Sequence, residues 1–241
     1  MMQKNKGIVL HHIKYGESGI IIYMFTRNFG RQTFIMQGIR RKKAMVRINM
    51  FQPLYILNLE VYYKPGREMH RIKEAKIHMA FHNISNNIYK NTIVLFLAEI
   101  LYRSIKTEEP DYSLFDFIES SLAILDKMET GYANFHLVFL LNLSRLLGFQ
   151  PNLKDAGTSG YFDLREGVMR ENLPAHSLYL SKTYSRLFAE LNALNYESMA
   201  NYKISHTERN LMTEHLLDYF QLHELNLSPI KSFKILKEVF S

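Results

Sequence analysis

The spacing of apolar residues along this 241-residue chain changes at about His82, and this change constrains the fold more than any other feature. Before it, apolar and polar side chains alternate, most clearly over residues 55–63, with the period of a half-buried strand. After it, apolar residues recur every three or four positions, as on the buried face of a helix. The sequence therefore predicts a β-rich domain over residues 1–80 and a mostly α-helical domain over residues 81–241.

The first 80 residues contain about five runs with the composition of strands. Residues 20–25 are β-branched and aromatic, which is typical of a strand buried on both faces. A second run follows over residues 33–39, and Pro65-Gly66 is expected to turn the chain into the last run, residues 68–77. Because no long helical pattern lies between these runs, they predict a small antiparallel barrel. The OB-fold is the leading candidate, since it is the common five-stranded barrel of this size.

The second part of the chain has six segments with helical spacing. They are expected over residues 93–105, 114–125, 135–146, 184–194, 211–220 and 230–240. Ser205 and Glu208 form a capping box before the fifth segment, and Ser228-Pro229 is expected to cap and open the last. Residues 150–180 contain several glycines and no helical spacing, which predicts an irregular subdomain. The predicted fold class is α+β multidomain, an OB-fold β-barrel followed by a mostly α-helical domain.

Charge is divided unequally between the two parts. Residues 1–80 hold fifteen of the 30 Lys and Arg residues but only four of the 23 carboxylates, a balance of +11, which leaves −4 for residues 81–241. A domain with such an excess of cations is suited to bind a polyanion. The opposite signs also support a division into two domains, which the length allows.

Composition and motifs exclude several function classes. The chain has no cysteine, which excludes disulfides, thiolate zinc sites, iron–sulfur ligation and a cysteine nucleophile. It has no Walker loop, G-x-G-x-x-G or G-x-S-x-G string, and the basic part has only four scattered carboxylates for two-metal hydrolysis. A binding protein rather than an enzyme is expected. Because no signal-peptide core or membrane-length apolar run is found, we expect a cytoplasmic protein without membrane attachment.

The densest group of cations follows the strand expected over residues 33–39. It consists of Arg40, Arg41, Lys42 and Lys43, with Arg47 close behind. If this loop runs along a nucleic acid, each cation displaces condensed counterions from phosphates. Further candidate DNA contacts in the same domain are Arg27, Arg31, Arg67, Arg71 and Lys73. A solvated basic loop is the alternative for the cluster alone, and the charge excess of the whole domain favours binding.

Aromatic residues of the basic domain could stack unpaired bases, as they do in single-strand binders. The candidates are Tyr23, Phe25, Phe29, Phe34, Tyr62 and Tyr63. Most of these are expected in the core. Phe29 and Tyr62 are the better candidates, because their neighbours are polar or they alternate out of the apolar face.

Two other functions remain open on the same residues. A basic barrel could bind RNA, because the electrostatic footprint is the same. The basic face could instead meet an acidic protein or a membrane surface, as in a protein-interaction scaffold.

Short strings along nearly the whole chain resemble the bacterial RecO family of recombination mediators. In the basic part they are Gly7-Ile8-Val9-Leu10, Tyr15-Gly16-Glu17-Ser18, Phe25-Thr26, Phe29-Gly30, Gly38-Ile39-Arg40 and Gln52-Pro53-Leu54. In the helical part they are Leu97-Ala98-Glu99-Ile100-Leu101-Tyr102, Leu114-Phe115, Phe117 and Leu146-Leu147-Gly148-Phe149-Gln150-Pro151. Their order and spacing carry the resemblance, since no single string is diagnostic.

The resemblance implies an N-terminal OB domain, a helical C-terminal domain and a role in DNA repair and recombination. It implies binding of single- and double-stranded DNA and annealing of complementary strands. It further implies partnership with RecR in the RecFOR pathway, so that RecA can load onto DNA coated by single-stranded-DNA-binding protein. A cytoplasmic, nucleoid-associated protein is expected on this basis.

The resemblance also bears on two sites in the helical domain. Many relatives bind zinc through two C-x-x-C pairs, which would fall near residues 154–160 and 174–178; neither stretch contains cysteine, so no zinc or other cofactor is expected. Relatives also bind the acidic, apolar C-terminal tail of single-stranded-DNA-binding protein. The residues that combine apolar and cationic character for such a tail are Tyr102, Arg103, His136, Leu140 and Arg145. Core packing is the alternative for each of them.

Overall fold

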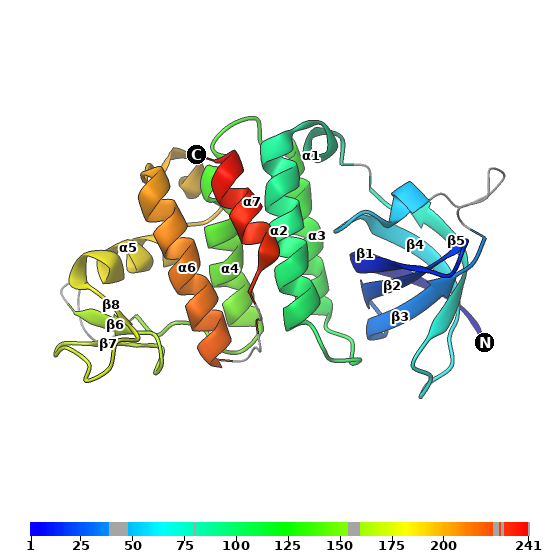
Figure 1. The fold of residues 1–241 in the computed structure, drawn as a ribbon, viewed down its shortest axis with the longest axis horizontal. Helices are drawn as coiled ribbons and strands as arrows, with labels where there is room; N and C mark the ends of the chain where they lie inside the picture. The colour runs from blue at the N-terminus through cyan, green and yellow to red at the C-terminus, as the bar shows by residue number, and fades with distance from the viewer. Residues whose placement is uncertain (39–47, 80, 154–159, 224–226, 228, 241) are drawn as a thin grey trace. The chain divides into compact units, whose positions relative to one another are not determined.

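The computed structural model describes residues 1–38, 48–79, 81–153, 160–223, 227 and 229–240 (Figure 1). Contacts divide the chain into two compact units, Met1–Asp126 and Lys127–Ser241. The first unit contains a strand-rich part and then three helices, α1 (His82–Asn86), α2 (Ile88–Ser104) and α3 (Tyr112–Lys127). The change from strands to helices occurs at His82, as the apolar spacing predicts, but the compact unit extends well beyond residue 80.

Five strands form a closed barrel in the first unit (Figure 1). They are β1 (Met2–Tyr15), β2 (Gly19–Thr26), β3 (Gly30–Met36), β4 (Ile56–Tyr62) and β5 (His70–Ile77). Their order around the barrel is β1-β2-β3-β5-β4, and the neighbouring pairs are antiparallel except for β3 and β5, which are parallel. The predicted five-stranded OB-type barrel is confirmed, with one parallel pair that the sequence does not reveal.

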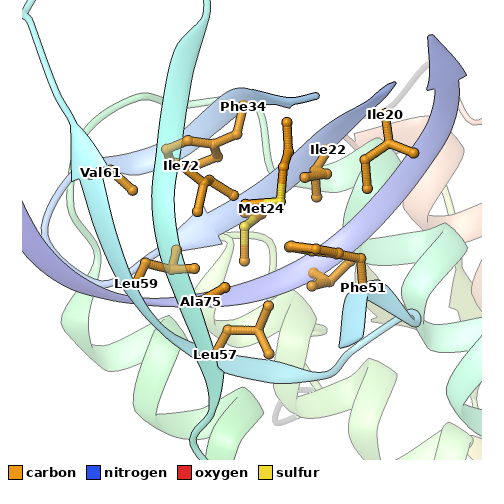
Figure 2. Packing of buried hydrophobic residues seen from close by; sticks show 12 residues of the cluster. Ile20, Ile22, Met24, Phe34, Phe51, Leu57, Leu59, Val61, Ile72 and Ala75 are labelled. Atoms are coloured by element: carbon orange, nitrogen blue, oxygen red, sulfur yellow. The ribbon is translucent and has the colours of Figure 1, made fainter. Parts of the chain in front are cut away.

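Alternate residues of the strands fill the barrel (Figure 2). Met24 points inward from β2, and Leu57 and Leu59 point inward from β4; all three are 2% exposed or less. Burial of a side chain of this size stabilises the fold by about 1.5–3 kcal/mol. The opposite face of β2 is buried too, because the ring of Phe25 lies 5.8 Å from that of Phe115 on α3. β2 is therefore buried on both faces, as its composition predicts.

The second unit combines helices with a small sheet. Its helices are α4 (Phe135–Leu146), α5 (Lys182–Asn192), α6 (His206–His223) and α7 (Lys231–Val239). Its strands are β6 (Tyr161–Asp163), β7 (Val168–Arg170) and β8 (Tyr179–Leu180), in the order β7-β6-β8. Residues 150–180 thus contain a three-stranded sheet where the sequence predicts irregular structure. Strands of two or three residues are too short to show alternation, so this prediction was wrong for a physical reason.

Two predicted helix starts in the second unit have different outcomes. Ser205 Oγ accepts a hydrogen bond from the Glu208 N–H (3.2 Å), and Glu208 Oε2 accepts one from the Ser205 N–H (2.8 Å), which confirms the capping box. The last helix begins at Lys231 after an extended Ile230, so Pro229 does not occupy its first turn. Ser228, the predicted cap, lies outside the described residues.

Candidate nucleic-acid interface

The outward faces of β1, β4 and β5 form one surface whose residues are fixed by strand register. Across these three strands, the rows of facing residues are Met2, Tyr62 and Arg71; Lys4, Glu60 and Glu74; and Lys6, Asn58 and Lys76. Cβ atoms of directly facing residues lie about 4.5–5.5 Å apart in such rows. We call the exposed cations of this surface, together with the exposed ring among them, the cationic face: Lys4, Tyr62, Arg71, Lys73 and Lys76.

Carboxylates neutralise only part of the charge on the cationic face. Lys73 Nζ lies 3.1 Å from Glu60 Oε2, and this hydrogen bond raises the pKa of Lys73. Lys76 Nζ lies 2.7 Å from Glu74 Oε1 and lowers the pKa of that carboxyl. The remaining two cations form no ion pair with any residue that the structure describes. The face therefore keeps a positive balance toward solvent, which suits a polyanionic ligand.

A hollow of about 410 Å³ lies among these cations. Lys4, Lys6 and Lys76 line it together with Asn58 and the carboxylates of Glu60 and Glu74. Lys6 is engaged elsewhere, since its Nζ donates to Glu119 Oε1 on α3 at 2.9 Å. Lys76 is paired with Glu74, so Lys4 is the lysine of the hollow that has no ion-pair partner among the described residues, while Lys6 joins the barrel to α3.

A turn joins β4 to β5 (Figure 1). Two further cations belong to this turn. Lys64 and Arg67 are exposed in it. The Arg67 N–H donates to the Lys64 carbonyl oxygen (3.3 Å), which closes the turn that Pro65-Gly66 predicts. Three residues predicted to contact DNA, Arg67, Arg71 and Lys73, are therefore brought together on β5 and the turn before it.

Arg27 and Arg31, two other predicted DNA contacts, are engaged with helices of their own unit. The Arg27 guanidinium hydrogen-bonds both carboxylate oxygens of Asp116 on α3, which raises the pKa of Arg27. Arg31 Nη1 donates to the carbonyl oxygens of Tyr102 (2.7 Å) and Ile105 at the end of α2. The last carbonyl groups of a helix lack partners within it, and Arg31 supplies one. The geometry thus supports a structural role for both arginines, which the sequence did not predict.

Replacing Arg31 by methionine is expected to lower the free energy of unfolding by about 1–2 kcal/mol, because two carbonyl oxygens lose a charged donor. DNA affinity should change little. Arg71→Met is the matched control, for which we expect weaker DNA binding and a stability change within about 0.5 kcal/mol. Urea denaturation and fluorescence anisotropy with a labelled oligonucleotide measure the two quantities. Loss of DNA affinity in Arg31→Met without loss of stability would contradict the structural role.

The densest predicted cluster, Arg40, Arg41, Lys42 and Lys43 with Arg47, lies outside the described residues. The described chain stops after β3 at Gly38 and resumes in a short 3-10 helix, Ile48–Phe51, whose Phe51 is buried in the barrel core. The role of the cluster in DNA binding stays a prediction.

The residues predicted to hold an acidic tail are divided between the two units. Tyr102 and Arg103 belong to α2 in the first unit, and the other three belong to α4 in the second. The ring of Tyr102 lies 4.7 Å from the guanidinium carbon of Arg31. Arg103 pairs with Glu99 one turn earlier on the same helix (2.9 Å). Both α2 residues therefore have partners within their own unit.

On α4, the structure places two of the three predicted tail-binding residues in the core. His136 and Leu140 are 1% and 0% exposed, so neither can contact a partner in this conformation. His136 Nε2 lies 3.0 Å from Thr213 Oγ1 on α6, and Thr213 Oγ1 donates to the Arg209 carbonyl oxygen (2.8 Å). Arg145 is exposed. The apolar spacing that suggested a binding groove at His136 and Leu140 is the spacing of a buried helix face.

Burial lowers the pKa of His136 to about 3, and the Arg209 cation acts in the same direction. Below pH about 6.5, the unfolded chain takes up a proton that the folded chain does not. Stability should therefore be full above that pH and fall as the pH decreases, by about 2 kcal/mol at pH 5. Urea unfolding at pH 5 and 7 measures the loss. In the control His136→Gln, the free energy of unfolding should differ less between pH 5 and pH 7, by about 2 kcal/mol. If that difference is unchanged, His136 is excluded as its source.

The residues near the expected zinc positions do not fit a thiolate zinc site, because the chain has no cysteine. In the part of the chain that the structure describes, no group of three or more potential metal ligands is found. Asp163 of β6 is buried, and its Oδ1 accepts hydrogen bonds from the N–H groups of Arg165 (2.9 Å) and Glu166 (3.1 Å). His176 Nε2 lies 3.2 Å from Asp163 Oδ2. These contacts connect β6 to the following turn and to the loop before β8.

The aromatic candidates for base stacking are separated by their burial. Phe25 and Phe34 are buried in the core. The ring of Phe29 is stacked on that of Tyr63, with centroids 3.8 Å apart and an interplanar angle of 5°. Tyr62 is exposed on the cationic face. Lys4 and Lys76, which sequence reasoning did not select, join this face because of register. Lys76 alternates with the apolar Ala75 and Ile77, which signals an outward position, but the neighbours of Lys4 are polar and give no such signal.

None of the helices in the described parts of the chain combines the length and apolar character needed to cross a bilayer.

Two family models match the sequence, "Recombination protein O N terminal" over residues 1–81 and "Recombination protein O C terminal" over residues 85–232. The proteins named DNA repair protein RecO from Bacteroides fragilis, Phocaeicola vulgatus and Flavobacterium psychrophilum are 39%, 36% and 35% identical to this chain. Each of these similarities covers 100% of both chains.

Proposed function

Because the chain belongs to the RecO family of DNA repair proteins, we propose that it binds single- and double-stranded DNA and anneals complementary strands. We further propose that it works with RecR to help RecA load onto DNA coated by single-stranded-DNA-binding protein. Membership of the family gives the chain a role in DNA repair and recombination. The observation that best supports the finer proposal is the cationic face, on which cations exceed carboxylates.

In this proposal, phosphates are contacted by Arg71 and Lys73 on β5, by Arg67 in the preceding turn, and by residues 40–43 with Arg47. Each contact releases condensed counterions, which supplies affinity without sequence preference. Cations near two strands also screen the repulsion between their backbones, so that complementary bases can pair. No bond is made or broken in these steps, and we assign no catalytic residue.

The partners proposed for the chain are DNA, RecR and the C-terminal tail of single-stranded-DNA-binding protein, with RecA reached indirectly. Among the five residues considered for the tail, Arg145 is exposed, so its guanidinium can reach the terminal carboxylate of the tail. We propose that the protein acts in the cytoplasm at the nucleoid, without a membrane or a zinc cofactor.

The proposed function is tested by strand annealing. Complementary oligonucleotides are coated with single-stranded-DNA-binding protein, either intact or lacking its C-terminal tail. The RecO-family chain is then added, and duplex formation is followed over time. We expect faster annealing than without it, and a smaller acceleration when the tail is missing. No acceleration on either substrate would overturn the annealing role.

The two other functions considered for the basic domain predict different results. An RNA-binding protein should prefer RNA when matched DNA and RNA oligonucleotides compete for it. A protein-interaction scaffold should neither bind nor anneal purified oligonucleotides without a further component. Direct binding with a preference for DNA supports the proposal over both.

A further inference from the structure

Tyr62 is an exposed aromatic ring at the end of β4, the strand of the cationic face that pairs with both β1 and β5. It is 50% exposed and faces Met2 on one side and Arg71 on the other. Its hydroxyl has no hydrogen-bond partner among the residues that the structure describes. Inward packing does not account for it, because the neighbouring β4 residue Val61 fills the barrel while Tyr62 points outward. The ring is therefore available to a ligand.

Other aromatic rings of the barrel lack this combination of exposure and charge. Phe29 is covered by its stacking partner Tyr63. Tyr23 lies 5.2 Å from the ring of Tyr102 on α2. Tyr15 is also 50% exposed, but the residue that faces it on β2 is Gly19 and no cation.

We propose that Tyr62 stacks an unpaired base of single-stranded DNA while Arg71 and Lys4 contact phosphates beside that base. The inference rests on the proposed function and deepens it, since it assigns the residue that recognises the unpaired state. Three features support single-stranded DNA as the ligand. The face carries a net positive charge, two of its cations have no ion-pair partner among the described residues, and an aromatic ring lies between the strands that carry these two cations. Cationic surfaces with exposed rings are how single strands are bound without sequence preference.

Stacking on Tyr62 gives the surface a way to distinguish substrate from product. In a single strand, the face of a base is free to cover the ring; in a duplex, each base is already stacked on its neighbours and paired. Formation of the duplex therefore withdraws the base from Tyr62 and leaves only the phosphate contacts. Single strands should bind more tightly than the annealed product, and Tyr62 should supply part of that difference.

The first experiment compares affinities for an oligothymidylate of about 16 nucleotides, the upper site size of one OB-fold, and for a duplex of equal length. Tyr62→Ala should bind the single strand about 5- to 150-fold more weakly, and the duplex within about twofold of the parent protein. Tyr62→Phe should retain single-strand affinity, because the ring is kept. Tyr15→Ala is the matched control, an equally exposed tyrosine without a facing cation, and should bind normally.

The second experiment uses the absence of tryptophan from the chain. In Tyr62→Trp, the emission of the only indole reports directly on stacking. We expect quenching when the oligothymidylate is added, and little quenching with an abasic oligonucleotide of the same length, which has phosphates but no bases. Tyr15→Trp should show little quenching with either. Circular dichroism confirms that each variant keeps the fold.

The outcomes separate failure of this inference from failure of the proposed function. If the unchanged protein raises no anisotropy with any DNA, DNA binding itself is wrong, and the stacking role falls with it. If it binds DNA, but Tyr62→Ala binds equally well and the Tyr62→Trp emission does not change, only the stacking role is overturned. Tighter binding of a matched RNA through Tyr62 would overturn the assignment to DNA.

Discussion

Replacing Arg40, Arg41, Lys42 and Lys43 by alanine is expected to weaken single-stranded DNA binding by roughly several hundred-fold at about 0.1 M salt. Each phosphate contact contributes about −0.7 to the slope of log affinity against log salt concentration, so the loss of four contacts flattens the slope by about 2.8. The loss should be similar for all base sequences, because phosphates carry no sequence information. Anisotropy titrations over a range of salt concentrations measure both quantities.

A control must separate the position of these cations from the total charge of the protein. Four exposed cations of the second unit serve this purpose: Arg165, Arg170, Lys182 and Lys203. Their replacement by alanine removes the same charge from a different unit. We expect a salt slope close to that of the parent protein, because the proposal assigns no phosphate contact to these four cations and salt screens attraction that involves no direct contact. Equal weakening in both variants would show that net charge matters and the 40–43 cluster does not.

Local periodicity predicted the parts of the fold in which one side chain pattern dominates. The spacing over residues 135–146 gives the bounds of α4 as the structure has them, Phe135–Leu146. The helix expected over residues 93–105 begins earlier, at Ile88, because the Asn87 side chain accepts hydrogen bonds from the N–H groups of Tyr89 and Lys90. Residues 88–92 are polar or exposed in part, so a search for apolar spacing omits the first turn.

The candidate site was harder to predict, because charge composition does not specify which side chains face one another. Arg31 and Arg71 look alike in the sequence, yet Arg31 binds the end of α2 and Arg71 is exposed beside Tyr62. The difference depends on which strand pairs with which and on where α2 ends. Both are long-range properties that a single sequence does not reveal. An excess of Lys and Arg over carboxylates can therefore identify a binding domain before its binding residues are known.

The way α2 and α3 are joined to the barrel leads to the second large effect. Gly30 begins β3 with a φ of +60°, and an added Cβ there would lie 2.4 Å from the carbonyl oxygen of Glu109 and 2.5 Å from the carbonyl carbon of Glu108. The loop cannot withdraw without loss of the hydrogen bond from the Arg31 N–H to the Thr107 carbonyl oxygen (2.9 Å). Gly30→Ala is therefore expected to lower the free energy of unfolding by about 3 kcal/mol, measured by urea denaturation.

Gly16→Ala isolates the part of this loss that comes from the loop. Gly16 has almost the same backbone conformation, with a φ of +58°, but nothing lies within 4 Å of the position that a Cβ would occupy. Its replacement should cost only the penalty of a left-handed alanine, about 1 kcal/mol. The excess loss in Gly30→Ala then measures how tightly the segment between α2 and α3 is held against β3. Equal losses in the two variants would mean that this segment yields to the added methyl group and does not fix the helices to the barrel.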